Sequence, residues 1–146
     1  MYYTITKDFK SFTPTEILYA DGFNVIDATI QKHVDQYIMF LKYETILPPP
    51  EKNIRIVRSS KLKSENNSAL ASISPDAWVE GPTVIQKDGN WIVYFELYRK
   101  HRMGGVSSPD LENCIDISGS IKFSEGTRHG SALKVKKGVL KKLTTA

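Results

Sequence analysis

The chain has 146 residues, of which 40% are hydrophobic and 25% charged, and its formal net charge is +4 at pH 7. This length and polarity fit one globular domain over residues 1–146 and exclude a mainly membrane-embedded chain. A single cysteine, Cys114, excludes an internal disulfide and is expected to be a small apolar core residue. Helical periodicity is weak throughout, so the sequence predicts a mostly β fold.

The positive charge is concentrated near the C-terminus, where five lysines occur without an acid: Lys134, Lys136, Lys137, Lys141 and Lys142. A lysine-rich end is more often a solvated face than a nucleic-acid site, and no helix-turn-helix pattern or stacking motif accompanies it. No run of eighteen apolar residues is present, and the first residues do not form a signal peptide. We therefore expect a soluble chain that binds neither nucleic acid nor membrane.

A strong strand signal follows the stretch Trp78-Val79-Glu80-Gly81-Pro82-Thr83. β-Branched and aromatic residues on both sides of Asp88-Gly89 predict a hairpin, with strands over 83–85 and 91–95. Gly81 allows close approach of the backbone, and proline is tolerated at the first residue of a strand. Glu80 is therefore expected to lie at the mouth of an apolar strand.

The same unit occurs 54 residues earlier. Thr29 corresponds to Thr83, and the equivalent pairs along the second strand are Tyr37 with Trp91 and Leu41 with Phe95. A third similarity links residues 6–11, 59–64 and 108–113, with offsets of 53 and 49 residues.

A period near fifty residues built from short strands is typical of β-propeller blades. We predict an all-β, partial propeller of about two full blades, over residues 27–65 and 80–118, with parts of two others. The partial blades are the outer end of one over residues 1–12 and the opening strand of another over 129–135. The Pro48-Pro49-Pro50 segment is interpreted as an insertion in a blade rather than a linker.

Asp27 and Glu80 begin the innermost strands of the two predicted full blades, and innermost strands line the central channel of a propeller. Two carboxyl groups that converge on one cavity are what glycoside cleavage needs, because one must donate a proton while others assist it. The alternative is that both acids are solvated residues at strand edges.

Four segments together resemble glycoside hydrolase family 43 and its five-bladed propeller relatives, from Tyr2 to about Val135. They are residues 23–29 (FNVIDAT), 78–83 (WVEGPT), 98–106 (YRKHRMGGV) and 128–130 (RHG). The resemblance implies a partial five-bladed propeller and inverting hydrolysis of arabinose-, xylose- or galactose-containing plant saccharides. It also implies a periplasmic or extracellular location.

The resemblance also implies roles for individual residues. Glu80 is the general acid, and Asp27 orients it and tunes its pKa. His129 corresponds to a histidine that holds a central ion, such as calcium, or a water; the alternative is a purely structural histidine. No cofactor is required for the reaction itself.

One part of the family pattern has no counterpart in this chain. Family members carry the general base, an aspartate, on the innermost strand of the first blade, and neither Asp8 nor Asp21 has a comparable context. The chain as given is therefore expected to turn over little substrate and to self-associate through open blade edges. The alternative function is a non-catalytic carbohydrate-binding or assembly fragment of such an enzyme.

Further candidates for contacting the sugar come from the loops after the two hairpins and from the loop before Glu80. They are Trp78, Arg99, His101, Arg102, Lys42 and Glu44. Trp78 is a candidate for stacking on a sugar face, whereas Trp91, in mid-strand, is expected in the core.

Overall fold

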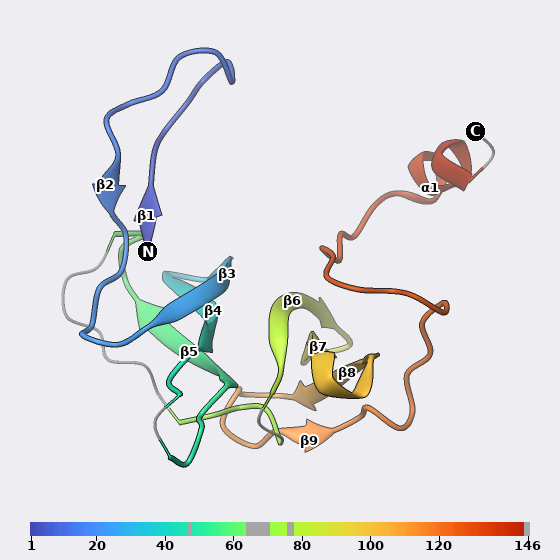
Figure 1. The fold of residues 1–146 in the computed structure, drawn as a ribbon. Helices are drawn as coiled ribbons and strands as arrows, with labels where there is room; N and C mark the ends of the chain where they lie inside the picture. Colours follow the sequence, from blue (N-terminus) through green and yellow to red (C-terminus); the bar gives the residue numbers. More distant parts are fainter. Residues whose placement is uncertain (47, 64–70, 76–77, 145–146) are drawn as a thin grey trace.

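The computed structural model describes residues 1–46, 48–63, 71–75 and 78–144, and its strands form three antiparallel sheets in chain order (Figure 1). The first sheet pairs β1 (Tyr2–Tyr3) with β2 (Glu16–Ile17). The second contains β3 (Val25–His33), β4 (Gln36–Tyr43) and β5 (Asn53–Ser59). The third contains β6 (Glu80–Lys87), β7 (Asn90–Leu97), β8 (Arg102–Ser108) and β9 (Ile115–Asp116). This arrangement is a partial β-propeller.

Both predicted hairpins are present, and each has a two-residue loop, between His33 and Gln36 and between Lys87 and Asn90. Asp88 and Gly89, with φ of 50° and 79°, form the two-residue loop between β6 and β7. Positive φ at both loop residues matches the twist of the strands, which explains why Asp-Gly is favoured there. Val34, 54 positions before Asp88, also has a positive φ, 53°.

Each hairpin also carries a β-bulge in its first strand. The register shifts between Ile26 and Thr29 in β3, and between Glu80 and Thr83 in β6. The bulges place Asp27 and Gly81, 54 residues apart, at positive φ of 53° and 60°. The prediction that Pro82 opens its strand was wrong, because β6 begins at Glu80 and the bulge accommodates the proline inside the strand.

The middle strand of the second sheet, β4, is buried on both faces, as expected for a blade between two neighbours. On one face Ile38 and Phe40 share a core cluster with Val93 and Phe95 of the third sheet. On the other, Met39 and Leu41 form a second cluster with Tyr19 and Val57. Trp91 is buried in the first cluster, which confirms it as a core residue, and the partly buried Cys114 packs against the same cluster.

The similarity between residues 6–11 and 108–113 is a repeated turn. The Thr6 and Ser108 hydroxyls accept hydrogen bonds from the backbone N–H of Phe9 and Leu111, each at 2.8 Å. Leu111 is 2% exposed in the core, whereas Phe9 is 86% exposed on the outer hairpin. The part of the middle copy at Ser64 lies outside the described residues.

The C-terminal part differs from the prediction. No strand forms over residues 129–135, which the structure describes, because their backbone has no ladder partner there; the Ala132 N–H instead donates to the Thr83 hydroxyl at 2.8 Å. After this segment, α1 (Lys137–Thr144) lies away from the sheets in Figure 1. Within the described part of the chain, no helix is long and apolar enough to cross a bilayer.

Candidate active site

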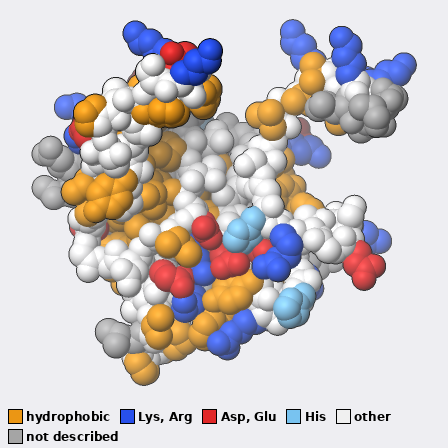
Figure 2. All heavy atoms as spheres, turned by 45° about the horizontal axis from the view of Figure 1, so that its top comes forward, with side chains coloured by type: hydrophobic (Ala, Val, Ile, Leu, Met, Phe, Trp, Pro, Cys, Tyr) orange, Lys and Arg blue, Asp and Glu red, His pale blue; other side chains and the backbone are white. Residues whose placement is uncertain are grey.

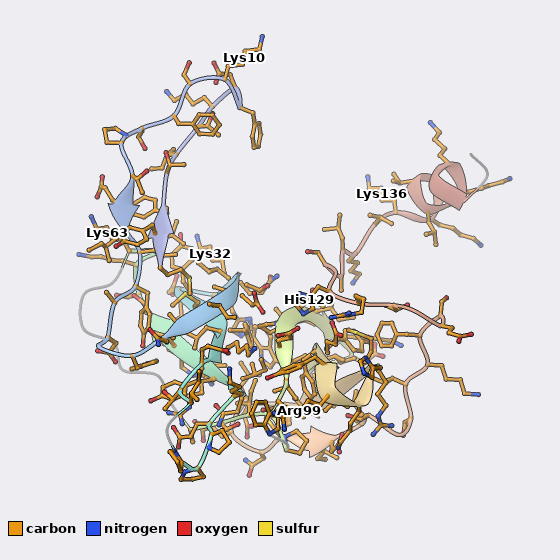
Figure 3. All side chains as sticks on the ribbon, viewed as in Figure 1. Lys10, Lys32, Lys63, Arg99, His129 and Lys136 are labelled. Carbon is orange, nitrogen blue, oxygen red and sulfur yellow. The ribbon has the colours of Figure 1, made fainter. Side chains whose placement is uncertain are left out.

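Asp27, Glu80 and His129 come together in space. Each offers a ligand atom, a carboxylate oxygen or an imidazole nitrogen, and these atoms lie within 4.8 Å of one another. The predicted convergence of Asp27 and Glu80 is thus present in the structure, and His129 joins it from a segment that forms no strand. Figure 2 shows acidic and basic side chains and a histidine gathered on one face, and Figure 3 shows His129 beside β6.

An open groove of about 300 Å³ lies over this cluster. Its lining consists of Asp27, Ala28, Thr29, Gly81, Pro82, His129, Gly130 and Ser131. The Glu80 side chain is 18% exposed and lies next to the groove rather than along its wall. The bulges explain this placement, because they turn Asp27 and Glu80 out of the regular alternation of their strands.

Each of the two Glu80 oxygens has a cationic or polar neighbour. Lys42 Nζ lies 2.9 Å from Glu80 Oε2, and His129 Nε2 lies 3.0 Å from Glu80 Oε1. Lys42 is also 2.9 Å from Glu44 Oε2. A carboxylate held from both sides has a fixed orientation, which a proton donor aimed at one atom of a substrate requires.

Lys42 was expected in a loop, and the structure corrects this, because Lys42 lies in β4 with its side chain only 3% exposed. Burial by itself lowers the pKa of the Lys42 ammonium, but hydrogen bonds to Glu80 and Glu44 outweigh burial and raise the pKa.

Glu44 follows the strand and pairs with both Lys42 and Lys52. Burial raises the pKa of Glu44, and hydrogen bonds from Lys52 and Lys42 outweigh this and lower it. The proposed role of Lys42 and Glu44 in sugar binding stays a prediction.

Sequence reasoning missed Glu96, in β7. Its side chain is 1% exposed, with Arg128 Nε 2.5 Å from Oε1 and His129 Nε2 3.3 Å from Oε2. Glu96 lies opposite Glu80 in the hairpin, as Lys42 lies opposite Ile26 in the other, so Lys42 and Glu96 are equivalent residues 54 positions apart. The sequence does contain a signal for Lys42 and Glu96: each is a charged residue in an otherwise apolar strand, and the two are 54 positions apart.

Gly81 makes room for His129. A Cβ at Gly81 would lie 2.7 Å from Cδ2 of the His129 ring, closer than atoms in a folded protein tolerate. The Gly81 N–H donates to Asp27 Oδ2 at 3.2 Å, and Thr29 donates to the carbonyl of Pro82 at 2.6 Å. Gly81 thus brings together the backbones of both blades and the imidazole.

Trp78, two residues before Glu80, has a strained backbone conformation. Its φ is 67°, an outlier for a bulky residue, and such strain is often found at functional sites. The Arg99 guanidinium lies 3.2 Å from the centre of its ring, and Tyr98 contacts the ring edge-on. A sugar stacking on that face of Trp78 would have to displace Arg99.

The remaining two candidates lie at the connection after the second hairpin. Arg99 is in the short 3-10 helix η1 (Tyr98–Lys100), His101 follows it with a φ of 49°, and Arg102 opens β8. His101 and Arg102 line a different cavity, of about 370 Å³, with residues 121–127. The fold therefore does not bring these two to the groove over Asp27 and His129, and their binding role remains a prediction.

The donor atoms of Asp27, Glu80 and His129 are two carboxylates and an imidazole. Calcium prefers six to eight oxygen ligands, whereas imidazole suits transition metals and zinc. In addition, the Lys42 ammonium already binds Glu80. The set therefore fits calcium poorly.

Comparisons with known proteins agree with the propeller fold. A family model described as "Probable glycosyl hydrolase domain", named as related to family 43, matches residues 1–139. A search of curated proteins found no match.

A solved structure with a similar fold is CoXyl43, a family 43 β-xylosidase/α-arabinofuranosidase from a compost microbial metagenome, in a calcium-free complex with xylotriose. The TM-score is 0.52 at 14% identity, over 68% of this chain. The match covers 36% of the CoXyl43 chain, so this chain spans about a third of it. Because the family model spans nearly all of the sequence, the chain belongs to the family 43-related glycosyl hydrolase domains.

Proposed function

We propose that the protein hydrolyses glycosidic bonds by inversion, with Glu80 as the general acid. The observation that supports this most is the meeting of Asp27, Glu80 and His129 within 4.8 Å, beside an open groove. Family membership supports glycoside hydrolysis as the class of reaction. Arabinose-, xylose- or galactose-containing plant saccharides are the proposed substrates, and the proposed location is periplasmic or extracellular.

In this proposal Glu80 gives its proton to the leaving oxygen while the bond from that oxygen to the anomeric carbon breaks. A water attacks the anomeric carbon from the opposite face and loses its proton to a base. Asp27 fixes the position of Glu80 by accepting the Gly81 N–H at 3.2 Å, in the residue that follows Glu80. Lys42 Nζ and His129 Nε2, at 2.9 and 3.0 Å from the two Glu80 oxygens, orient the carboxyl group.

Inversion places acid and base roughly 6.5 to 9.5 Å apart, to leave room for the water. Among the described residues that line the groove, Asp27 is the one carboxylate, and its hydrogen bond to Gly81 assigns it to the side of the acid. Glu96 is too buried to meet a water on the far face of a sugar. The base therefore has to come from outside the described groove wall.

This arrangement favours a second candidate, non-catalytic carbohydrate binding by the 146-residue chain. The two functions are separated by adding xylo- and arabino-oligosaccharides and following both binding, by calorimetry, and release of reducing sugar. Binding without release supports the second candidate, and neither binding nor release contradicts both.

Glu80→Gln tests the proposed acid in a form of the protein, such as a self-associated one, for which hydrolysis has been observed. The variant should lose hydrolysis of oligosaccharides, whose leaving groups need a proton, and retain cleavage of activated aryl glycosides, whose leaving groups do not. Glu112→Gln, at an exposed glutamate far along the chain, is the matched control. Full activity of Glu80→Gln on unactivated oligosaccharides would remove Glu80 from the mechanism.

A further inference from the structure

We infer that Glu96 is a positioning residue, which holds the imidazole of His129 against Glu80. The inference rests on the proposed function only in giving Glu80 a catalytic role. The placement of His129 by Glu96 is a structural claim that can be tested without any activity.

The first argument is the environment of Glu96. Its side chain is 1% exposed in β7, between the buried apolar residues Phe95 and Leu97. A carboxylate in such a place is costly unless cations or hydrogen-bond donors meet it. The neighbours that the structure gives it are Arg128 and His129, consecutive residues of a segment without regular structure.

The second argument is what else holds that segment. Its backbone makes no strand ladder over residues 129–135, and nearby the Ala132 N–H donates a hydrogen bond to the Thr83 hydroxyl. The Arg128 side chain is 66% exposed, so its guanidinium remains near solvent while its Nε meets Glu96. The buried charge of Glu96 thus draws Arg128 and His129 to the sheet.

The third argument is geometric. His129 Nε2 lies 3.0 Å from Glu80 Oε1 and 3.3 Å from Glu96 Oε2, so one nitrogen is within ion-pair distance of both carboxylates, and the buried Glu96 oxygens have no partner in hydrogen-bond geometry. The ring fits against Gly81, where a Cβ would come within 2.7 Å. Glu96 contacts the imidazole from the buried side, and Gly81 leaves room for it because glycine has no side chain. Together they define the position of the imidazole relative to Glu80.

The test is NMR spectroscopy of the whole 146-residue chain. Gly81 has a hydrogen in the direction of a Cβ, so it should show a ring-current shift and a nuclear Overhauser effect to the His129 ring. Glu96→Gln, nearly identical in shape but neutral, should diminish both signals, and His129→Ala should abolish them. Glu112→Gln, an exposed control, should leave them as in the wild type. A folded Glu96→Gln chain with both signals intact would overturn the inference.

Should Glu96→Gln fail to fold, Glu96→Asp provides the test, because it keeps the charge and withdraws it by one methylene. Weakened Gly81–His129 signals would support the inference, and unchanged signals would contradict it. The Asp variant should also retain more of the contact than the Gln variant where both fold, which a merely space-filling role of Glu96 does not predict.

Steady-state kinetics provide a second test, in the form of the protein for which hydrolysis is observed. Glu96→Gln should lower kcat/KM by about 100-fold, the scale of a misplaced catalytic group. In a His129→Ala background the same change should have almost no further effect, because Glu96 acts through His129. An equal loss in both backgrounds overturns the inference. Absence of hydrolysis and of sugar binding by the wild type would contradict the proposed function alone, and the NMR result still decides the role of Glu96.

Discussion

The backbone N–H of Gly81 donates a hydrogen bond to Asp27 Oδ2 over 3.2 Å, and so joins equivalent bulge positions of two neighbouring hairpins. Both residues have positive φ, which a bulge of this kind requires. The site thus arises from a backbone irregularity that the chain uses twice, with an acid at the bulge in one hairpin and just before it in the other.

Gly81→Ala should destabilise the fold and displace His129. The new Cβ would meet the His129 ring at 2.7 Å, and Gly81 has a φ of 60°. Gly89→Ala is the matched control, because Gly89 has a φ of 79° with no atom near its Cβ position. The left-handed conformation costs each alanine about 1–2 kcal/mol. Urea unfolding should show a larger loss at Gly81, and equal losses would mean that His129 does not occupy this space.

Lys42→Met should destabilise the chain by about 3–5 kcal/mol, since removing one partner of a buried ion pair leaves the others without compensation. Lys42 is buried and holds both Glu80 and Glu44. Lys87→Met, on the exposed end of β6, is the control and should change the free energy of unfolding little. A Lys42→Met chain as stable as the control would contradict the buried network.

Glu44 should stabilise the protein in a pH-dependent way. Its folded-state pKa lies below 4.5, so its contribution is present above pH 4.5 and is lost as the pH falls through the lower folded-state value. The raised pKa of Lys42 acts at the other end, where stability is lost only as the pH rises beyond 10.5. Chemical unfolding of the wild type and Glu44→Gln should therefore differ at pH 7 and converge in strong acid. A constant difference across that range would exclude the linkage.

The chain should self-associate, because the outer hairpin exposes apolar side chains that its internal equivalents bury. Phe9 is 86% exposed, although Leu111 at the corresponding place is 2% exposed. Phe9→Ser should reduce association in sedimentation velocity experiments while the melting temperature changes little. A wild-type chain that stays monomeric and melts cooperatively at high concentration would contradict this expectation.

Asp27→Asn should weaken hydrolysis of oligosaccharides without abolishing it, in contrast to Glu80→Gln. The amide keeps an oxygen that can accept the Gly81 N–H but loses the charge beside Glu80, so the pH profile of kcat/KM should change shape. An unchanged profile would show that Asp27 acts only as a hydrogen-bond acceptor.

Local chemistry determined much of the fold from the sequence alone. Asp88-Gly89 specified the turn between β6 and β7, β-branched and aromatic residues on both sides of it specified the strands, and the 54-residue offset specified two equivalent hairpins. Each of these depends on neighbours in the chain, which a sequence displays directly. The offset also placed Asp27 and Glu80 at related positions, and their convergence followed from that.

Tertiary structure decided the partners of those acids. Lys42 is buried against Glu80, and Glu96 is buried against His129. These pairings depend on how two sheets and an irregular segment pack together, and no local sequence pattern shows which charges will pair. The segment after residue 128 was predicted as a strand, but a strand needs a ladder partner as well as suitable residues. The sequence determined the two repeated hairpins and the placement of their acids, and the packing of separate segments against them determined the charged network around the acid.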